Sequence, residues 1–177
     1  MNRNYFILAI VVLLTCCKSK EIASNNDFYI ENDSINLYAF IGEKISLEEF
    51  DPNENNADRI EIDSLTGEKI IHKKIVMDNA FKAKYKVIKN VFNKLKTDTI
   101  TFVVYDHYGR PKFEKYQNVL LYISKNANEK SFYHQKYLFD IVIKNSNEKW
   151  TGTKGQNLKK LFKEKQNGVL KERKVFN

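Results

Sequence analysis

Short segments rich in β-branched and aromatic residues recur along this chain, and they restrict its fold more than any other feature. Phe81–Val87 alternates apolar and basic side chains with a period of two, which is typical of a strand with one buried and one solvated face. Thr99–Tyr105 and Val119–Ile123 have the composition of central strands, and Phe132–Phe139 with Ile141–Ile143 adds one or two more. The chain is therefore predicted to be mainly β.

An earlier strand and a hairpin precede this series. Ile35–Ile41 has a strong strand signal, and Gly42 after it predicts a bulge or a point of close approach. The acidic residues 48–63 predict a long loop. The turn at residues 64–68 joins two short flanks, Arg59–Ile62 and Lys69–Ile71, into a predicted hairpin.

One helix is predicted near the C terminus. Leu158, Leu161 and Phe162 have helical spacing in a lysine-rich background, and Gly168 marks its end. The 177 residues, of which 42% are hydrophobic and 13% aromatic, suit one domain with a packed core. Together these patterns predict a small antiparallel OB-like barrel or sandwich with a C-terminal helix.

The first sixteen residues have the pattern of a signal peptide for export. Arg3 precedes an unbroken apolar run over residues 5–14. As a helix, that run would cover roughly 15 Å, whereas the hydrocarbon core of a bilayer is about 30 Å thick. The run is thus too short to span a membrane, and its length and basic start are those of a secretory signal.

The two cysteines of the chain follow this run directly. Leu14-Thr15-Cys16-Cys17 resembles the lipobox of bacterial lipoproteins, which implies cleavage before Cys17 and lipidation of its thiol. Choosing Cys16 as the acceptor would put the bulky Leu14 close to the cut, so Cys17 is preferred. The alternative is an ordinary secreted protein with two incidental cysteines. Several acyl chains on one cysteine satisfy the requirement that stable anchoring takes more than one chain.

The lipobox resemblance predicts location and domain division. Lys18 is not the aspartate that retains some lipoproteins in the inner membrane, which points to the outer membrane of a bacterial cell envelope. The predicted parts are a signal peptide at 1–16, a lipidated tether at 17–33, a β-barrel at 34–150 and a basic helical tail at 151–177. The mature domain would have no free thiol for a disulfide, a metal or a nucleophile.

The order of strands resembles the netrin-like domain, an OB-type barrel also found in tissue inhibitors of metalloproteinases. The likeness lies in the glycine-containing turn at Ala39–Ile45, the segment Tyr85–Asn93, the strand Thr99–Tyr105 and the tyrosine-bearing strand Asn118–Ile123. The disulfide cysteines of that family are absent. Its inhibitors bind zinc through a free N-terminal cysteine, and Cys17 would have an acylated amine, so that mechanism is not expected here.

The charge of the chain is unevenly distributed. The net charge is +8, with seven acids and one base between Glu48 and Asp63 but nine bases and two acids between Lys149 and Lys174. The basic tail suits anionic lipid, nucleic acid or an acidic partner, or it is simply a solubilising, frayed end. Basic and aromatic residues also interleave along Phe81–Lys89, but an exported, lipid-anchored protein is not expected to meet nucleic acid.

The most distinctive polar segment is the turn after the strand Thr99–Tyr105. Tyrosine and arginine are frequent anchors of interfaces, so this turn is predicted to bind a protein partner. The alternative is a plain hairpin connection closed by an aspartate and by Gly109. The candidate binding residues are Tyr105, Asp106, His107, Tyr108 and Arg110.

No enzyme motif or cofactor is predicted. The chain has no Gly-x-Ser-x-Gly, no phosphate loop and no His-Glu-x-x-His. The second hypothesis is a metal-dependent or hydrolytic envelope protein that uses Asp106, His107 and His134, with His72 as the third histidine. Its test is whether the histidines converge. The leading hypothesis is a lipid-anchored envelope protein whose small β-barrel binds another protein, with the membrane as its second partner.

Overall fold

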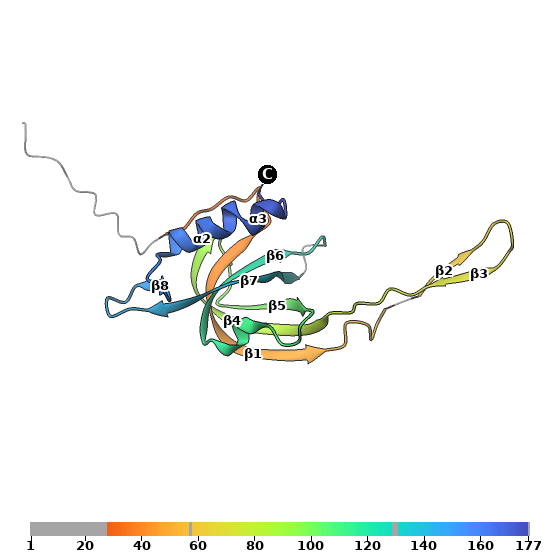
Figure 1. Ribbon diagram of the computed structural model, residues 1–177, viewed down its shortest axis with the longest axis horizontal. Helices are drawn as coiled ribbons and strands as arrows, with labels where there is room; N and C mark the ends of the chain where they lie inside the picture. Colours follow the sequence, from red (N-terminus) through yellow and green to blue (C-terminus); the bar gives the residue numbers. More distant parts are fainter. Residues whose placement is uncertain (1–27, 57, 129–130, 177) are drawn as a thin grey trace, which may run out of the picture.

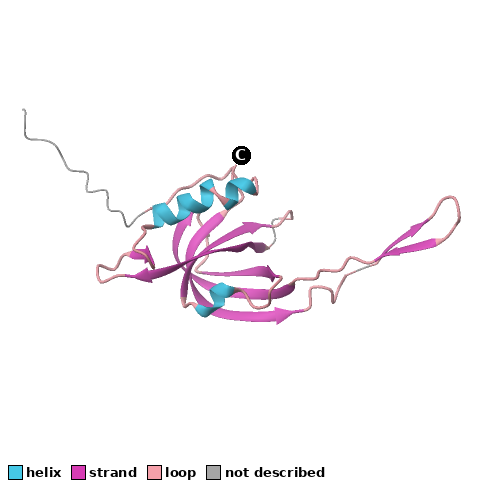
Figure 2. Ribbon diagram, in the orientation of Figure 1, coloured by secondary structure: helices cyan, strands magenta, loops and turns pink. Residues whose placement is uncertain are grey.

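The computed structural model describes residues 28–56, 58–128 and 131–176, and it confirms a mainly β fold with helix at the C-terminal end (Figures 1 and 2). The strands and helices are β1 (Tyr38–Phe50), β2 (Arg59–Ile62), β3 (Lys69–His72), β4 (Asn79–Phe92), β5 (Thr99–Asp106), η1 (Lys112–Lys115), β6 (Asn118–Lys125), β7 (Phe132–Lys144), β8 (Trp150–Gly152), α2 (Leu158–Asn167) and α3 (Val169–Glu172). The predicted hairpin is thus present as β2 and β3.

The main sheet bends and closes partly into a ring. Its strand order is β5-β4-β1-β6-β7-β8, and β5 also pairs with β7. Neighbouring strands are antiparallel except for this closing pair, in which Phe102 and Val103 lie opposite Phe132 and Tyr133 in parallel. The arrangement is compatible with the five-stranded, partly open barrel of the OB type. The predicted barrel is therefore confirmed.

Alternation along the strands fills the barrel. In β4 the apolar residues Phe81, Ala83 and Tyr85 are buried, while the lysines between them are exposed. Inside the barrel, Tyr85 packs against Phe102 with ring centroids 5.7 Å apart. Gly42 is required here because a Cβ would lie 2.9 Å from both a Phe40 and a Tyr85 ring carbon. The predicted close approach at this glycine is confirmed, and the β1–β4 register also shifts beside it.

The C-terminal helix belongs to the core. Phe162 on α2 stacks on Phe92 of β4, with ring centroids 5.1 Å apart. The Asp140 carboxylate on β7 accepts hydrogen bonds from the Tyr122 hydroxyl and from Lys165 Nζ on α2, both at 2.9 Å. The helix thus closes one end of the barrel through both apolar and polar contacts. Within the described residues, no helix has the length and apolarity needed to cross a bilayer.

Two segments outside the predicted barrel contact its core. Phe28 and Ile30, assigned to the tether, pack against the core, and Ile30 bridges Phe92. The predicted basic helical tail contains α2 and α3, and its Leu158 and Leu170 are buried, so residues 151–176 do not form the frayed end that was the alternative. Strand β8 runs across Trp150, the last residue of the predicted barrel. The signal peptide and Cys17 lie outside the described residues.

A long arm, described over residues 51–56 and 58–78, joins β1 to β4. It projects from the barrel and carries the β2–β3 hairpin at its far end (Figure 1). Near the barrel the two sides of the arm are joined by Asn53, whose side chain accepts from the Val76 backbone N–H at 2.8 Å and donates to its carbonyl at 2.9 Å. The predicted acidic loop is therefore partly β1, partly β2 and partly this connection.

Candidate binding pocket at the end of strand β5

A pocket of about 370 Å³ opens where β5 ends, within the size range of ligand sites in proteins. It lies between the turn after β5, the short helix η1 and strand β7. Its lining residues are Val104, Tyr105, Asp106, Tyr108, Arg110, Pro111, Lys112, Phe113, His134, Tyr137 and Phe139. Four of the five candidate binding residues therefore line one pocket, and His134 joins them from another strand.

The turn after β5 presents Tyr108 at the mouth of this pocket. Asp106 is buried, and its Oδ1 accepts from the Tyr108 backbone N–H at 2.9 Å, which closes the turn. Gly109 has a φ of +104°, which a residue with a side chain rarely adopts. Tyr108 itself is 83% exposed. Asp106 therefore closes the turn, as the alternative expected, but the turn is no hairpin connection because β5 and β6 do not pair. Tyr108 is left exposed beside the pocket.

The opposite wall is a bulge in β7. Leu121 on β6 pairs with Phe139, whereas Ile123 pairs with His134, so residues 135–138 lie opposite Tyr122 alone. Within the bulge Tyr137 has a φ of +66°, an uncommon conformation for an aromatic residue. Bulges and strained residues are enriched beside functional sites. Here the bulge turns a half-exposed tyrosine ring toward Tyr108, with ring centroids 6.1 Å apart.

Several polar contacts hold this bulge in place. The His134 ring nitrogen Nε2 lies 2.8 Å from the Leu138 carbonyl oxygen, across the bulge. The buried Gln135 side chain donates to the Ser124 hydroxyl at 2.8 Å, and Arg173 after α3 donates to the Lys136 carbonyl at 2.8 Å. The unusual backbone is therefore fixed from β6 and from the C-terminal helices.

His134 is a buried polar residue of the pocket wall, as Asp106 is, and its ring packs among aromatic side chains of the barrel. A carbonyl oxygen only accepts, so Nε2 carries the proton and Nδ1 is left with its lone pair. Within the described residues Nδ1 makes no hydrogen bond. Burial lowers the pKa of His134 to about 4, so the ring is neutral at physiological pH. It offers an acceptor atom beside the apolar rings of Phe113 and Phe102.

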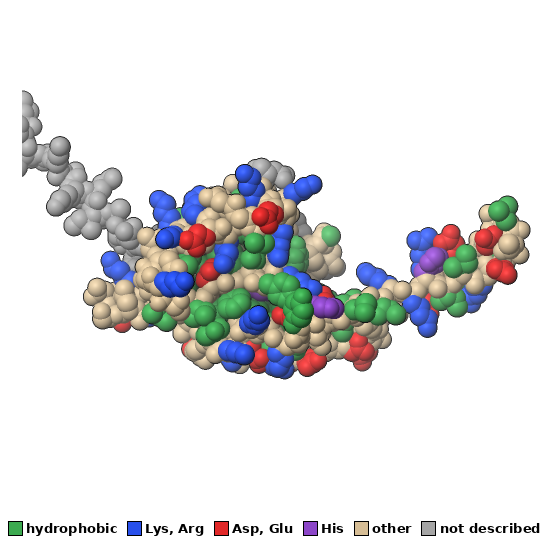
Figure 3. Space-filling view, viewed as in Figure 1, with side chains coloured by type: hydrophobic (Ala, Val, Ile, Leu, Met, Phe, Trp, Pro, Cys, Tyr) green, Lys and Arg blue, Asp and Glu red, His purple; other side chains and the backbone are tan. Residues whose placement is uncertain are grey.

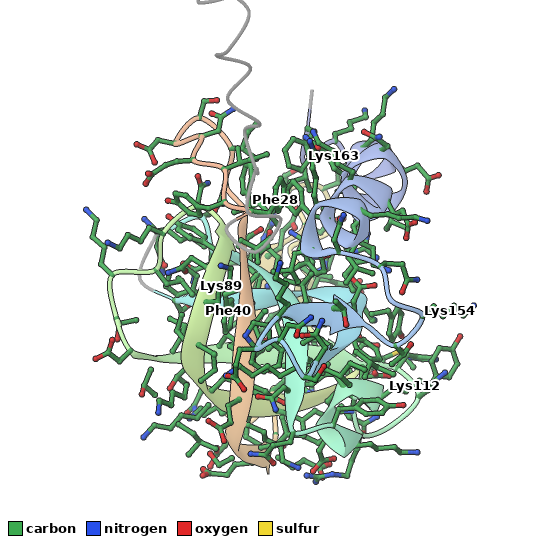
Figure 4. The ribbon with its side chains drawn as sticks, turned by 90° about the vertical axis from the view of Figure 1, so that its left-hand side faces the viewer. Phe28, Phe40, Lys89, Lys112, Lys154 and Lys163 are labelled. Atoms are coloured by element: carbon green, nitrogen blue, oxygen red, sulfur yellow. The ribbon has the colours of Figure 1, made fainter. Side chains whose placement is uncertain are left out.

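Arg110 forms the cationic side of the pocket. Its guanidinium binds both carboxylate oxygens of Glu114, at 2.6 and 2.7 Å, and lies 5.4 Å from the centre of the Phe81 ring. This pairing lowers the pKa of the Glu114 carboxyl. These contacts connect η1 to the turn after β5. The neighbouring Lys112 is exposed, and it lies at the opposite end of the barrel from Lys163 of α2 (Figure 4).

His107 does not line the pocket but lies between it and the arm. Its Nδ1 is 3.2 Å from the Asp78 carboxylate, and Lys136 Nζ binds the other oxygen of that carboxylate at 2.6 Å. The Lys136 ammonium is the main reason that the Asp78 pKa is lowered. Asp78 is the last residue of the arm, so these contacts place the base of the arm beside the pocket.

The histidines do not converge. His72 lies on the arm, where it contacts Glu61, His107 contacts Asp78, and His134 is buried on the Leu138 carbonyl. No three His, Cys, Asp or Glu side chains among residues 28–56, 58–128 and 131–176 could hold a metal ion together. The arrangement therefore gives no support to the metal-dependent hypothesis.

Sequence reasoning missed the part of the site that comes from η1 and β7. Phe113, Tyr137 and Phe139 form much of the apolar surface of the pocket. Nothing in the segment Phe132–Phe139 distinguishes a bulged strand from a regular one, since both are rich in aromatic residues. The short helix was hidden because η1 has only four residues, too few for a periodic signal.

The sequence matches no known protein family, and no curated protein or solved structure resembles it significantly. Function is therefore inferred from the geometry of the pocket.

Proposed function

We propose that this chain is an exported lipoprotein of the bacterial cell envelope that binds another protein through the pocket at the end of β5. The observation that carries this proposal is the preformed pocket itself. One wall of the pocket contains Tyr137 and is formed by the bulge in β7, which several hydrogen bonds hold in place. Tyr137 has a left-handed backbone that a bulky residue rarely adopts. Strained residues of this kind cluster at active sites and ligand-binding sites.

The chemistry of the pocket suits an apolar side chain from the partner. Its inner wall is formed by Val104, Phe113 and Phe139, and its mouth by Tyr108 and Tyr137. Exposed tyrosines combine a large apolar area with little conformational freedom, which makes them common anchors of interfaces. A leucine-sized or aromatic side chain would bury its surface here and displace water from these rings.

Acidic residues beside that apolar side chain would strengthen binding. Arg110 and the exposed Lys112 lie on the same side of the pocket. Arg110 is already paired with Glu114, whereas Lys112 forms no ion pair within the described residues. We therefore expect a partner segment with an apolar residue close to an aspartate or glutamate, so that charge steers and orients it.

We further propose that the protein is anchored in the outer membrane. The lipobox-like Leu14–Cys17 supports an anchor on Cys17, and Lys18 supports transfer to the outer membrane. An anchor of this kind would hold the barrel near the membrane surface, where it would meet other envelope proteins.

Selection of short peptides from a displayed library tests the binding site. The full chain is the target, and selected peptides are then measured against Tyr108→Ser. We expect peptides with an apolar residue next to an acid, and a loss of affinity of about tenfold or more in the variant, as for a tyrosine hot spot. Tyr29→Ser, an exposed tyrosine outside this pocket, is the matched control and should bind as the parent does. Equal binding by the Tyr108 variant would refute the site.

A further inference from the structure

The arm exposes an unusual number of large apolar side chains. They are Ile60, Ile62, Leu65, Ile70, Ile71, Ile75 and Met77, with relative exposures between 41% and 94%. Figure 3 shows hydrophobic side chains continuing from the barrel along the arm to its tip. A two-stranded hairpin is at best marginally stable alone in water, so an arm of this composition is expected to be covered by another surface.

One face of the hairpin is mostly apolar and the other is mostly polar. Side chains alternate along a strand, and paired residues share a face. Ile60 pairs with Ile71, and Ile62 lies on the same face opposite Lys69. On the other face Glu61 contacts Arg59 and His72 and lies opposite Ile70. Three of the four isoleucines of the hairpin therefore share the mostly apolar face, and all three are exposed.

The charge of the arm is opposite to that of the rest of the chain. Residues 51–78 contain seven acids and four bases, although the whole chain has a net charge of +8. At the hairpin tip, Leu65 is 94% exposed and has Asp63 and Glu68 close to it in sequence. An apolar side chain beside carboxylates matches the apolar wall of the pocket and its Arg110 and Lys112.

The position of the arm makes mutual exchange between two copies possible. The base of each arm lies beside the pocket of its own chain, because Asp78 at the end of the arm contacts His107 and Lys136 next to that pocket. If two copies lie antiparallel about a two-fold axis, the tip of each arm reaches the base of the other arm and hence the other pocket. Each pocket then holds the arm tip of the other copy, so that the two copies form a closed dimer. The two apolar hairpin faces also come side by side.

We propose that the occupant of the pocket is the arm tip of a second copy, with Leu65 inserted beside Tyr108 and Arg110 of its partner. This inference rests on the proposed function, because it names the partner of the same pocket. It also accounts for the exposure of Ile60, Ile62 and Ile71, which would be buried between the two arms. The partner is thus identified by its chemistry as another copy of this chain.

Disulfide trapping between two differently labelled chains tests the exchange. Full-length chains in mild detergent carry Cys16→Ser and Cys17→Ser, which removes both native thiols. One preparation adds Leu65→Cys and the other Lys112→Cys at the pocket. After mixing and mild oxidation, we expect a disulfide-linked heterodimer. Lys159→Cys, an exposed lysine on α2 at the other end of the barrel, is the matched control and should give at least about tenfold less.

Sedimentation of the cysteine-free chain supplies an independent measurement. The parent should sediment as two copies, and Leu65→Ser as one, with unchanged circular dichroism because this side chain packs against nothing in its own chain. A parent that stays monomeric, or equal trapping by Lys112→Cys and Lys159→Cys, would overturn the proposal.

The two proposals fail differently. If the selected peptides bind the pocket through Tyr108 but no arm exchange is trapped, the binding site stands and its partner is a different protein. If Tyr108→Ser changes neither peptide binding nor dimerisation, the pocket is not the site and both proposals fall.

Discussion

His134 shows how one side chain serves both the scaffold and the site. It spans the β7 bulge through the Leu138 carbonyl and packs against Phe113, with ring centroids 4.9 Å apart. The same contacts fix its tautomer, so the geometry that holds the bulge also determines which nitrogen remains an acceptor. A sequence search for metal ligands selects this residue for its type alone, whereas its burial on β7 makes it a structural histidine.

The titration of His134 is expected to make stability fall in mild acid. Its pKa is lowered from 6.5 to about 4 by burial, so between these values the unfolded chain binds a proton that the folded chain does not. The part of the unfolding free energy that depends on a neutral His134 is fully present above pH 6.5. It decreases by on the order of 3 kcal/mol as the pH falls toward 4. Urea unfolding across this range should show that slope in the parent.

Two substitutions isolate the contribution of His134. His134→Gln retains an N–H donor for the Leu138 carbonyl but has no group that titrates in this range, so its slope should be shallower. The exposed His107→Gln should keep the slope of the parent. Identical slopes in all three proteins would show that His134 is already protonated or exposed in the native state.

At the scale of elements, α2 behaves as a part of the barrel core. Phe162 is fully buried and stacks on Phe92, and Asn157 caps the helix by accepting from the Lys160 backbone N–H at 2.8 Å. Replacing a buried phenylalanine by alanine removes apolar contact and leaves a cavity, which typically costs about 3–5 kcal/mol. We expect Phe162→Ala to lose stability in that range by thermal or urea unfolding, and Lys159→Ala on the exposed face to change it little.

The elements were predictable where a single pattern decides them. Period-two alternation identified Phe81–Val87, and the spacing of Leu158, Leu161 and Phe162 identified the helix. The bulge in β7 was not predictable, because it arises from register against β6 and from contacts such as Arg173 with the Lys136 carbonyl, which are distant in sequence. The turn containing Tyr108 was found from sequence, but its opposing wall was not, for the same reason.

For the whole molecule, the barrel has distinct features at its two ends. Helix α2 covers one end. Lys112, which lines the pocket, lies at the opposite end from Lys163 of α2 (Figure 4). The described chain starts at Phe28, which packs against Phe162 on the helix side with ring centroids 5.8 Å apart. The first described residue thus lies away from Lys112 at the pocket (Figure 4).

The proposed anchor gives the prediction that concerns the whole molecule in the cell. Cys17→Ser should abolish incorporation of labelled fatty acid and move the protein out of the membrane fraction, because the apolar run at residues 5–14 is too short to hold it there. Cys16→Ser is the matched control, since it keeps a small residue before the cut and should be lipidated as the parent is. Mass spectrometry of the parent should find Cys17 as the first residue with its acyl chains. An uncut N terminus, or lipid on Cys16, would contradict the assignment.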